Sequence, residues 1–136
     1  MPEERILGTG IDIVETDRMR NVLERWGDSF RNRVFVPDER SYCDSKASPS
    51  EHYAGRLAVK EAVSKAFGTG LGPSLTWSDI EVVRDAESGA PSVRLSVRGQ
   101  RLAETRGVTR VLVSLSHSRH YAVAHAILVG DDHEAG

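Results

Sequence analysis

The spacing of apolar residues in the first third of the chain predicts a strand followed by helices. Residues 6–14 are mostly apolar, and Gly8 and Gly10 interrupt them, so we expect a broken first strand. Apolar residues then recur at helical spacing as far as Gly27. Thr16 is placed to cap this helix and Gly27 to end it, with a short helix or turn continuing beyond it. The triplet Pro37-Asp38-Glu39 is typical of the first turn of another helix.

The middle of the chain predicts one long helix from about residue 50 to Phe67. Pro49 suits its first turn, and Gly68 is placed to end it. One face is apolar and consists of Ala58, Val59, Ala62, Val63 and Ala66. The opposite, polar side is expected to carry Lys60, Glu61, Ser64 and Lys65.

The last third predicts strands and one short helix. A hairpin is expected from strands at 80–84 and 92–97, followed by a helix at about 98–106. Strands at 108–116 and 121–129 complete the pattern. The last strand is apolar on both faces, so we expect both to be covered. Packing within the domain and contact with another subunit both explain this pattern.

The fold class predicted from these elements is α+β, with an antiparallel sheet packed against a long helix. At 136 residues the chain fits a single domain, assigned to residues 1–130, with a disordered tail at 131–136. A net charge of −2 creates no overall attraction to nucleic acid or to an anionic membrane. We expect no signal peptide and no membrane span, because no window approaches the roughly 20 apolar residues that a span requires. Cys43 is the only cysteine, which excludes a disulfide framework and indicates a cytoplasmic protein.

Two acidic residues far apart in the sequence are candidate ligands of a metal ion. Asp12 lies between Ile11 and Ile13, so in a strand its side chain points to the other face, where its charge needs a partner. Glu61 lies among cations on the long helix. Two neighbouring carboxylates repel, and a divalent ion relieves that repulsion. Mg²⁺ suits such a pair, because it binds one or two protein carboxylates together with phosphate oxygens and water. The alternative for Asp12 is a turn or cap residue.

The same helix carries cations suited to phosphate. Arg56, Lys60 and Lys65 precede the glycine-rich exit at 68–70, and together they favour a phosphorylated substrate. Glu61 and Lys65 are also spaced as an ordinary i,i+4 surface ion pair, worth about 0.3–0.5 kcal/mol. The residues alone do not exclude that interpretation.

A third candidate segment, residues 113–120, joins the last two strands. Its Ser116, His117 and Ser118 offer hydrogen-bond donors to a phosphate or a base, and histidine exchanges protons near neutral pH. A polar hairpin turn without function is the alternative. Serine nucleophile chemistry is disfavoured, because adjacent residues of an extended segment point to opposite faces and no G-x-S-x-G motif is present.

Three ordered motifs give the chain a strong resemblance to a known family. They are GIDIVETDR, AGRLAVKEAVSKAFGTGLG and VSLSHSRHYAVA. In this order and spacing they resemble the holo-acyl-carrier-protein synthases, the small bacterial class of 4′-phosphopantetheinyl transferases. Leu57, where an aromatic residue is common, and Val36, where Thr or Ser is usual, depart from the pattern but leave the proposed metal and phosphate residues intact.

The resemblance implies a fold, an activity and roles for particular residues. It implies the 4′-phosphopantetheinyl transferase-like fold and Mg²⁺-dependent transfer of phosphopantetheine from coenzyme A to a serine of an apo acyl carrier protein. Adenosine 3′,5′-bisphosphate is released. It further implies a homotrimer with active sites between subunits. The roles implied are metal binding by Asp12 and Glu61, catalysis by these two and Lys65, coenzyme A binding by Arg56, Lys65, Gly68, Ser116 and His117, and carrier binding by Arg18.

Two other functions remain compatible with the residues alone. A module that binds coenzyme A or a nucleotide without turnover would share the basic helix, yet would not need both acids. A metal-dependent diphosphate hydrolase would release phosphopantetheine without any carrier. Which carrier protein the enzyme serves stays open.

Overall fold

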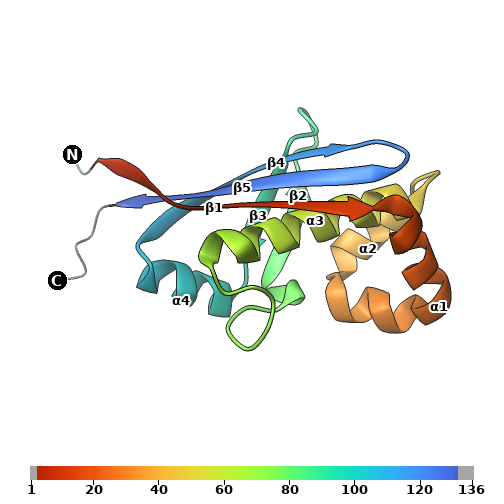
Figure 1. Ribbon diagram of the computed structural model, residues 1–136, viewed down its shortest axis with the longest axis horizontal. Helices are drawn as coiled ribbons and strands as arrows, with labels where there is room; N and C mark the ends of the chain where they lie inside the picture. The colour runs from red at the N-terminus through yellow and green to blue at the C-terminus, as the bar shows by residue number, and fades with distance from the viewer. Residues whose placement is uncertain (1–2, 132–136) are drawn as a thin grey trace.

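The computed structural model describes residues 3–131 and lays a sheet of long strands across one long helix (Figure 1). The elements in chain order are β1 (Glu4–Glu15), α1 (Thr16–Val34), α2 (Pro37–Asp44), α3 (Pro49–Phe67), η1 (Trp77–Asp79), β2 (Ile80–Arg84), β3 (Pro91–Leu95), α4 (Val97–Thr105), β4 (Val108–His117) and β5 (Tyr121–Asp131). The predicted elements are thus all present, with shifts of a few residues at their ends.

The main sheet has the order β1-β5-β4 and is antiparallel throughout. Its inner face packs on α3 through small side chains of the central strand, since Ala122, Ala124 and Ala126 are almost fully buried. Strands β2 and β3 form a separate antiparallel hairpin. The predicted α+β class, with an antiparallel sheet against a long helix, is confirmed.

Strand β1 runs through both Gly8 and Gly10, but its register against β5 shifts between Ile6 and Gly8. The predicted interruption is therefore confirmed as a local irregularity before Gly8 and is wrong at Gly10. The two glycines lie against the backbone of α3. A Cβ atom added to Gly10 would lie 2.1 Å from the carbonyl oxygen of Ala62, and one added to Gly8 would lie 2.2 Å from that of Ala66. The glycines therefore allow strand and helix to approach each other closely, which brings Asp12 next to the last turns of α3.

Helix α1 contains a break where the sequence predicted an end. Gly27 has φ +54°, outside helical geometry, and the chain resumes as helix up to Val34. Thr16 was predicted to cap the helix, but the cap position belongs to Glu15, and the buried Thr16 hydroxyl has no hydrogen-bond partner in the part of the chain that the structure describes. The Thr16 backbone N–H instead donates to the carbonyl of His120 at 2.9 Å, tying the start of α1 to the β4–β5 turn.

Helix α3 ends as predicted at Gly68, whose φ of +77° is left-handed. Its polar side is less exposed than expected, because Lys60 and Ser64 are buried. The Lys60 ammonium lies 2.9 Å from the Glu39 carboxylate and also donates to the carbonyls of Trp77 and Ile80. The prediction that Lys60 serves phosphate binding is therefore wrong.

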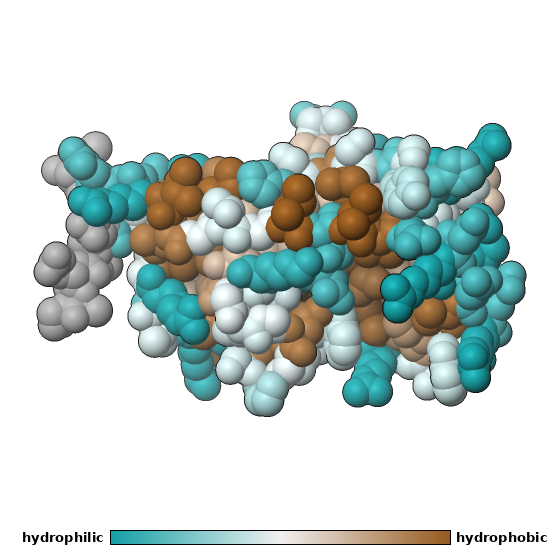
Figure 2. Space-filling model, viewed as in Figure 1, coloured by the Kyte–Doolittle hydropathy of each residue, from teal (hydrophilic) through white to brown (hydrophobic). Residues whose placement is uncertain are grey.

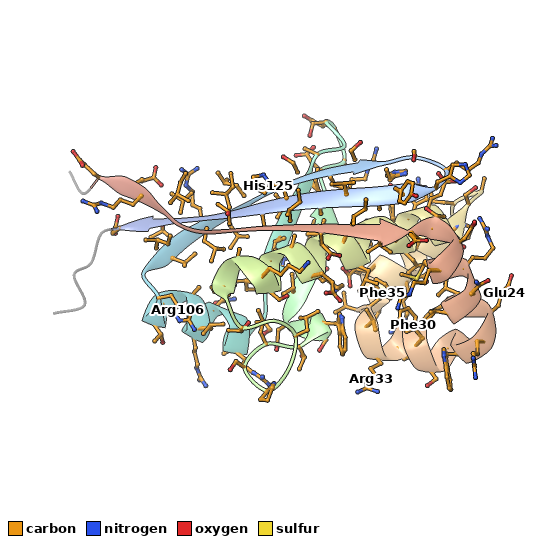
Figure 3. All side chains as sticks on the ribbon, in the orientation of Figure 1. Glu24, Phe30, Arg33, Phe35, Arg106 and His125 are labelled. Atoms are coloured by element: carbon orange, nitrogen blue, oxygen red, sulfur yellow. The ribbon has the colours of Figure 1, made fainter. Side chains whose placement is uncertain are left out.

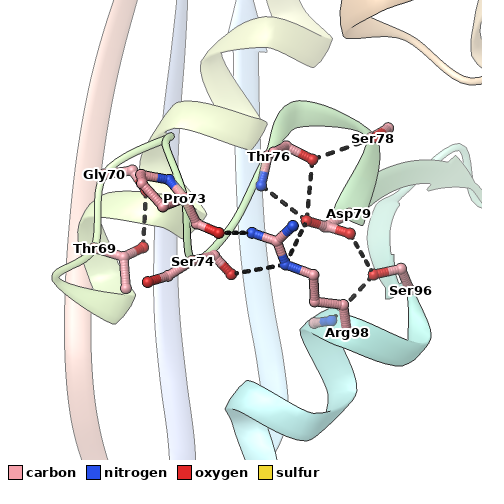
Figure 4. A network of polar contacts seen from close by, with 10 residues as sticks. Thr69, Gly70, Pro73, Ser74, Thr76, Ser78, Asp79, Ser96 and Arg98 are labelled. Atoms are coloured by element: carbon pink, nitrogen blue, oxygen red, sulfur yellow. Dashed lines mark hydrogen bonds and ion pairs between the residues drawn. The ribbon is translucent and has the colours of Figure 1, made fainter.

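The loop after α3 is held by a polar network centred on Asp79 (Figure 4). The Asp79 carboxylate accepts from the Thr76 N–H at 2.8 Å and from the Ser96 hydroxyl at 2.7 Å. Arg98 donates to the carbonyls of Pro73 and Ser74. These contacts fix the glycine-rich loop to α4 and β2.

The outer face of the main sheet carries exposed apolar side chains. Ile11 is 63% exposed and Ile13 is 61% exposed, and Figure 2 shows apolar surface following the line of β1. His125 lies on the same sheet, in the register row that joins Ile11 of β1 to Ser114 of β4 (Figure 3). The last strand, β5, was predicted to be covered on both faces. In one chain its inner face is buried, while His125 on its outer face is exposed.

Two further findings concern the sequence predictions. Across residues 3–131 every helix is too short or too polar to cross a bilayer. Strand β5 extends to Asp131, one residue past the expected end of the domain, and the rest of the predicted tail lies outside the described residues.

Candidate active site

Asp12 and Lys65 meet where the edge strand β1 passes the last turn of α3. The Lys65 ammonium donates to the Asp12 carboxylate at 2.7 Å and to the carbonyl of Ile11 at 3.1 Å. The Lys65 side chain is 50% exposed and that of Asp12 is 15% exposed. The cation is therefore accessible and has a carboxylate beside it, so an arriving anion can compete for it.

Glu61 lies one helical turn before Lys65 and faces the same region. Burial raises the pKa of the Glu61 carboxyl, and the negative charge of Asp12 raises it further. The charge of Lys65 opposes this effect. The indole N–H of Trp77 also favours the ionised carboxylate, although it is buried without a regular hydrogen-bond partner. The two acids thus disfavour each other's charge, which is the situation that a bound cation relieves.

The two acids border a hollow of about 370 Å³ between β1, α1 and α3. Its apolar lining comprises Ile13, Val14, Met19, Val22, Phe30 and Leu57. Phe30, which Figure 3 labels, comes from α1. Arg18 from the first turns of α1 lies at its rim together with Tyr121. The hollow combines an apolar wall with one cation, that of Arg18, and three carboxylates, those of Asp12, Glu15 and Glu61.

A second, smaller pocket of about 150 Å³ lies on the other side of the molecule's long helix. Arg56 of α3 and His117 at the end of β4 both line it. The rings of His52 and His117 contact edge to face, with centroids 5.1 Å apart, and His117 Nδ1 lies 3.9 Å from the Glu51 carboxylate. Burial lowers the pKa of His52, and the nearby His117, Arg56 and Lys46 lower it further. Because the guanidinium groups of Arg56 and Arg84 both line the pocket, it is suited to an anion.

The two pockets occupy opposite flanks of α3. Glu61 and Leu57 face the β1 edge of the sheet, whereas Arg56 and His52 face the hairpin and the β4 edge. At 100° per residue, Arg56 and Glu61 are separated by about 140° around the helix. One chain therefore carries an acid pair and an anion pocket that do not open onto the same cavity.

Comparison with known proteins identifies the family. A sequence model described as the 4'-phosphopantetheinyl transferase superfamily matches residues 8–126. The chain belongs to this superfamily. The matched range includes the acid pair, both pockets and all three motifs.

Two relatives named holo-[acyl-carrier-protein] synthase resemble the chain over nearly its whole length. The holo-[acyl-carrier-protein] synthase of Ruminiclostridium cellulolyticum is 46% identical over 130 residues, which is 94% of this chain and 95% of that protein. The protein of the same name from Chlamydia trachomatis is 48% identical over 122 residues, covering 90% of this chain and 98% of the relative.

Solved structures of the superfamily show the same fold. The holo-[acyl-carrier-protein] synthase of Neisseria meningitidis superposes with a TM-score of 0.85 at 29% identity, covering 91% of this chain and 98% of that one. The Helicobacter pylori enzyme, solved in complex with coenzyme A, gives a TM-score of 0.78 at 31% identity, with 88% and 98% covered. The predicted 4′-phosphopantetheinyl transferase-like fold is thereby confirmed.

Not all predicted site residues of this superfamily member come together within one chain. Asp12, Glu61 and Arg18 share the first hollow, and Arg56 and His117 share the second pocket. Ser116 is exposed on β4, next to His117 but outside the lining of both pockets. Gly68 ends α3 and lines neither pocket. Its positive φ gives Gly68 a structural role, which is to end the helix.

Sequence analysis missed several residues that line the pockets. Tyr42, His52 and Arg84 line the second pocket, and Tyr121 lines the first. Tyr42 comes from α2, the helix before α3, and Arg84 comes from the end of β2, which follows α3 after a long loop. Only the tertiary fold brings them to Arg56, so spacing gave no signal for them.

Proposed function

We propose that this protein transfers 4′-phosphopantetheine from coenzyme A to a serine of an apo acyl carrier protein and releases adenosine 3′,5′-bisphosphate. The observation that carries the proposal is that Asp12 lines one hollow together with Glu61 and also accepts a hydrogen bond from Lys65, in a chain of this superfamily. The relatives that cover it nearly end to end are holo-[acyl-carrier-protein] synthases. A cytoplasmic location accords with a lone, buried thiol.

The acid pair fits a hard divalent cation. Both donors are carboxylates, and the negative charge of Asp12 raises the pKa of Glu61. No group of three or more His, Cys, Asp or Glu side chains that could hold a metal occurs within residues 3–131. Mg²⁺ matches a two-carboxylate site, because it completes its shell with substrate phosphate oxygens and water. When bound there, it would neutralise charge on the diphosphate of coenzyme A.

The chain's own residues would then position the reaction. The carrier serine hydroxyl attacks the β-phosphorus, the bond from that phosphorus to the bridging oxygen breaks, and the electron pair leaves with adenosine 3′,5′-bisphosphate. Lys65, half exposed, is placed to turn from Asp12 to the diphosphate and balance the charge that develops there. The hydroxyl proton passes to Glu61 or to a water that it orients. The hollow's apolar wall keeps bulk water from the reacting atoms.

Coenzyme A and the carrier would use different surfaces. The second pocket, with Arg56 and His117, provides cationic groups for a phosphate of coenzyme A. Arg18 at the rim of the first hollow provides a cation for an acidic carrier surface. Gly68 and Ser116 line neither pocket. They would contact coenzyme A only if it were bound between two subunits.

We further propose a homotrimer whose active sites lie between subunits. The acid pair and the anion pocket lie on opposite flanks of α3, so a second copy must supply one of them to each complete site. The outer sheet face provides an apolar surface for that contact, with Ile11 and Ile13 each over 60% exposed. Ser116 is exposed on β4 of the same sheet, from which it can reach a neighbour's site.

Intact-mass analysis of a panel of apo carrier proteins tests the proposed activity. With Mg²⁺ and coenzyme A, a cognate carrier should gain the mass of one phosphopantetheine. Absence of any mass gain across the panel would refute the transferase. Tight coenzyme A binding without a mass gain would instead identify a binding module, and phosphopantetheine release without a carrier would identify a hydrolase.

A further inference from the structure

Three cations surround the ring of Tyr42 on α2. The Arg56 guanidinium carbon lies 4.1 Å from the ring centroid, the Lys46 ammonium 4.5 Å and the Arg84 guanidinium carbon 5.8 Å. All three distances fall within the roughly 6 Å over which a cation is attracted to an aromatic face. These cations come from α3, from the loop after α2 and from the end of β2. One ring therefore gathers charges from three separate segments.

The gathered charges are not neutralised by carboxylates. Within residues 3–131, none of these three cations has an acidic oxygen within 4.0 Å. Glu51 faces His117, and the exposed Asp85 lies near enough to Arg84 for that cation to help lower its pKa. Like charges brought together in this way repel, so the cluster is costly unless an anion joins it.

Arg56 gives independent support for a ligand. It is only 6% exposed, and its buried Nε–H has no hydrogen-bond partner among residues 3–131. A buried donor of a charged group is normally satisfied, because leaving it unpaired costs the desolvation of that group. Arg56 lines the 150 Å³ pocket together with Tyr42 and Arg84. The unpaired donor thus belongs to a pocket that already holds positive charge.

We propose that Tyr42 is a positioning residue for coenzyme A. Its ring holds the three cations close together around the phosphate group of coenzyme A that takes no part in the transfer. This inference rests on the proposed transferase function. The reacting diphosphate belongs at the acid pair, so the group left for a separate cationic pocket is the 3′-phosphate. The Tyr42 hydroxyl makes no hydrogen bond within the described residues. The role therefore belongs to the aromatic face.

Tyr42→Leu and Tyr42→Phe separate the ring's role from that of its hydroxyl. For Tyr42→Leu we expect KM for coenzyme A to rise about tenfold, the order of one or two lost cation–π contacts, with kcat within about twofold. With dephospho-coenzyme A, which lacks the 3′-phosphate, Tyr42→Leu should behave like the unchanged protein. Tyr42→Phe should match the unchanged protein with both substrates. Melting temperatures of both variants check that the fold is retained.

Either of two results would overturn the role of Tyr42. One is an equal rise in the KM of Tyr42→Leu for coenzyme A and for dephospho-coenzyme A. The other is a rise in KM for coenzyme A that is equal in Tyr42→Phe and Tyr42→Leu. Calorimetric binding of coenzyme A and dephospho-coenzyme A gives the same comparison without any carrier protein. If no carrier is modified but binding still depends on the ring and the 3′-phosphate, the transferase function fails and the role of Tyr42 stands.

Discussion

The Lys65 ammonium lies 2.7 Å from the Asp12 carboxylate, although 53 positions separate the two residues in the sequence. The contact joins an edge strand to the end of a helix, and Gly8 and Gly10 permit it by removing side chains between them. It keeps a cation in place at the acid pair before substrate arrives. The same geometry makes Lys65 and Glu61 the most informative positions to change.

Replacing Lys65 should slow transfer while leaving the fold intact. Lys65→Met removes the charge that balances the diphosphate, and we expect kcat to fall by about 100-fold or more, the usual cost of losing one such group. Lys65→Arg retains the charge and should recover part of the rate. A Lys65→Met enzyme that works at the normal rate in the mass assay would remove this residue from the mechanism.

Changing Glu61 should reveal a pH-dependent gain in stability. The folded-state pKa of Glu61 is raised above its unfolded value, chiefly by burial, so the stability linked to this group is present at low pH and lost as pH rises through the folded pKa. Without metal, Glu61→Gln should therefore melt at a higher temperature than the unchanged protein at pH 7, and the difference should shrink below about pH 4.

The same pair of proteins reports on metal binding without any assay of activity. Adding Mg²⁺ should raise the melting temperature of the unchanged protein and have less effect on Glu61→Gln. Equal shifts in both proteins would place the ion elsewhere.

Replacing Lys60 should destabilise the fold. Lys60 and Glu39 form an ion pair at 2.9 Å with both side chains 0% exposed, and burial lowers the pKa of Lys60. Removing one member leaves an unpaired buried charge, so Lys60→Met should cost about 3–5 kcal/mol in urea unfolding. Lys65→Met is the matched control, since its half-exposed ion pair should cost less than about 1 kcal/mol. Equal losses of unfolding free energy in Lys60→Met and Lys65→Met would contradict the structural role of Lys60.

A methyl group at Gly10 should also destabilise the protein. The added Cβ would lie 2.1 Å from the Ala62 carbonyl oxygen, so β1 and α3 must separate. We expect Gly10→Ala to lower the unfolding free energy by about 1–3 kcal/mol and to impair transfer, because Asp12 moves away from Lys65. Gly72→Ala has open space around the new methyl group and should change stability by less than about 0.5 kcal/mol.

A charge on the outer sheet face should disrupt the proposed trimer. Ile11→Asp places a carboxylate on the β1 edge of that face, and light scattering should then report smaller particles at micromolar concentration. Val97→Asp is the control, because Val97 is equally exposed at 63% but lies on α4. An unchanged protein that is already monomeric would refute the shared active site.

Local signals predicted most of the fold. Helix α3 and its end at Gly68 followed from apolar spacing, Pro49 and a glycine, and the hairpin followed from its turn residues. Gly10 was misinterpreted, since a glycine that interrupts a strand and one that admits a helix backbone look the same in a sequence. Lys60 was also misplaced, because its buried partner Glu39 lies on a different helix.

The candidate site was predictable only in part. Asp12, Glu61 and Lys65 came from motifs, and the structure brings them together. Tyr42 and Arg84 gave no such signal, because their approach to Arg56 is created by tertiary packing.

The placement of the acid pair and the anion pocket on opposite flanks of α3 predicts that two inactive variants can complement each other. In a ring of three copies, each boundary would combine the acids of one copy with the anion pocket of the next. Two defective proteins, Glu61→Gln and Arg56→Ala, would then yield some boundaries with both halves intact when they are mixed and reassembled. Mixing two inactive preparations should therefore restore activity.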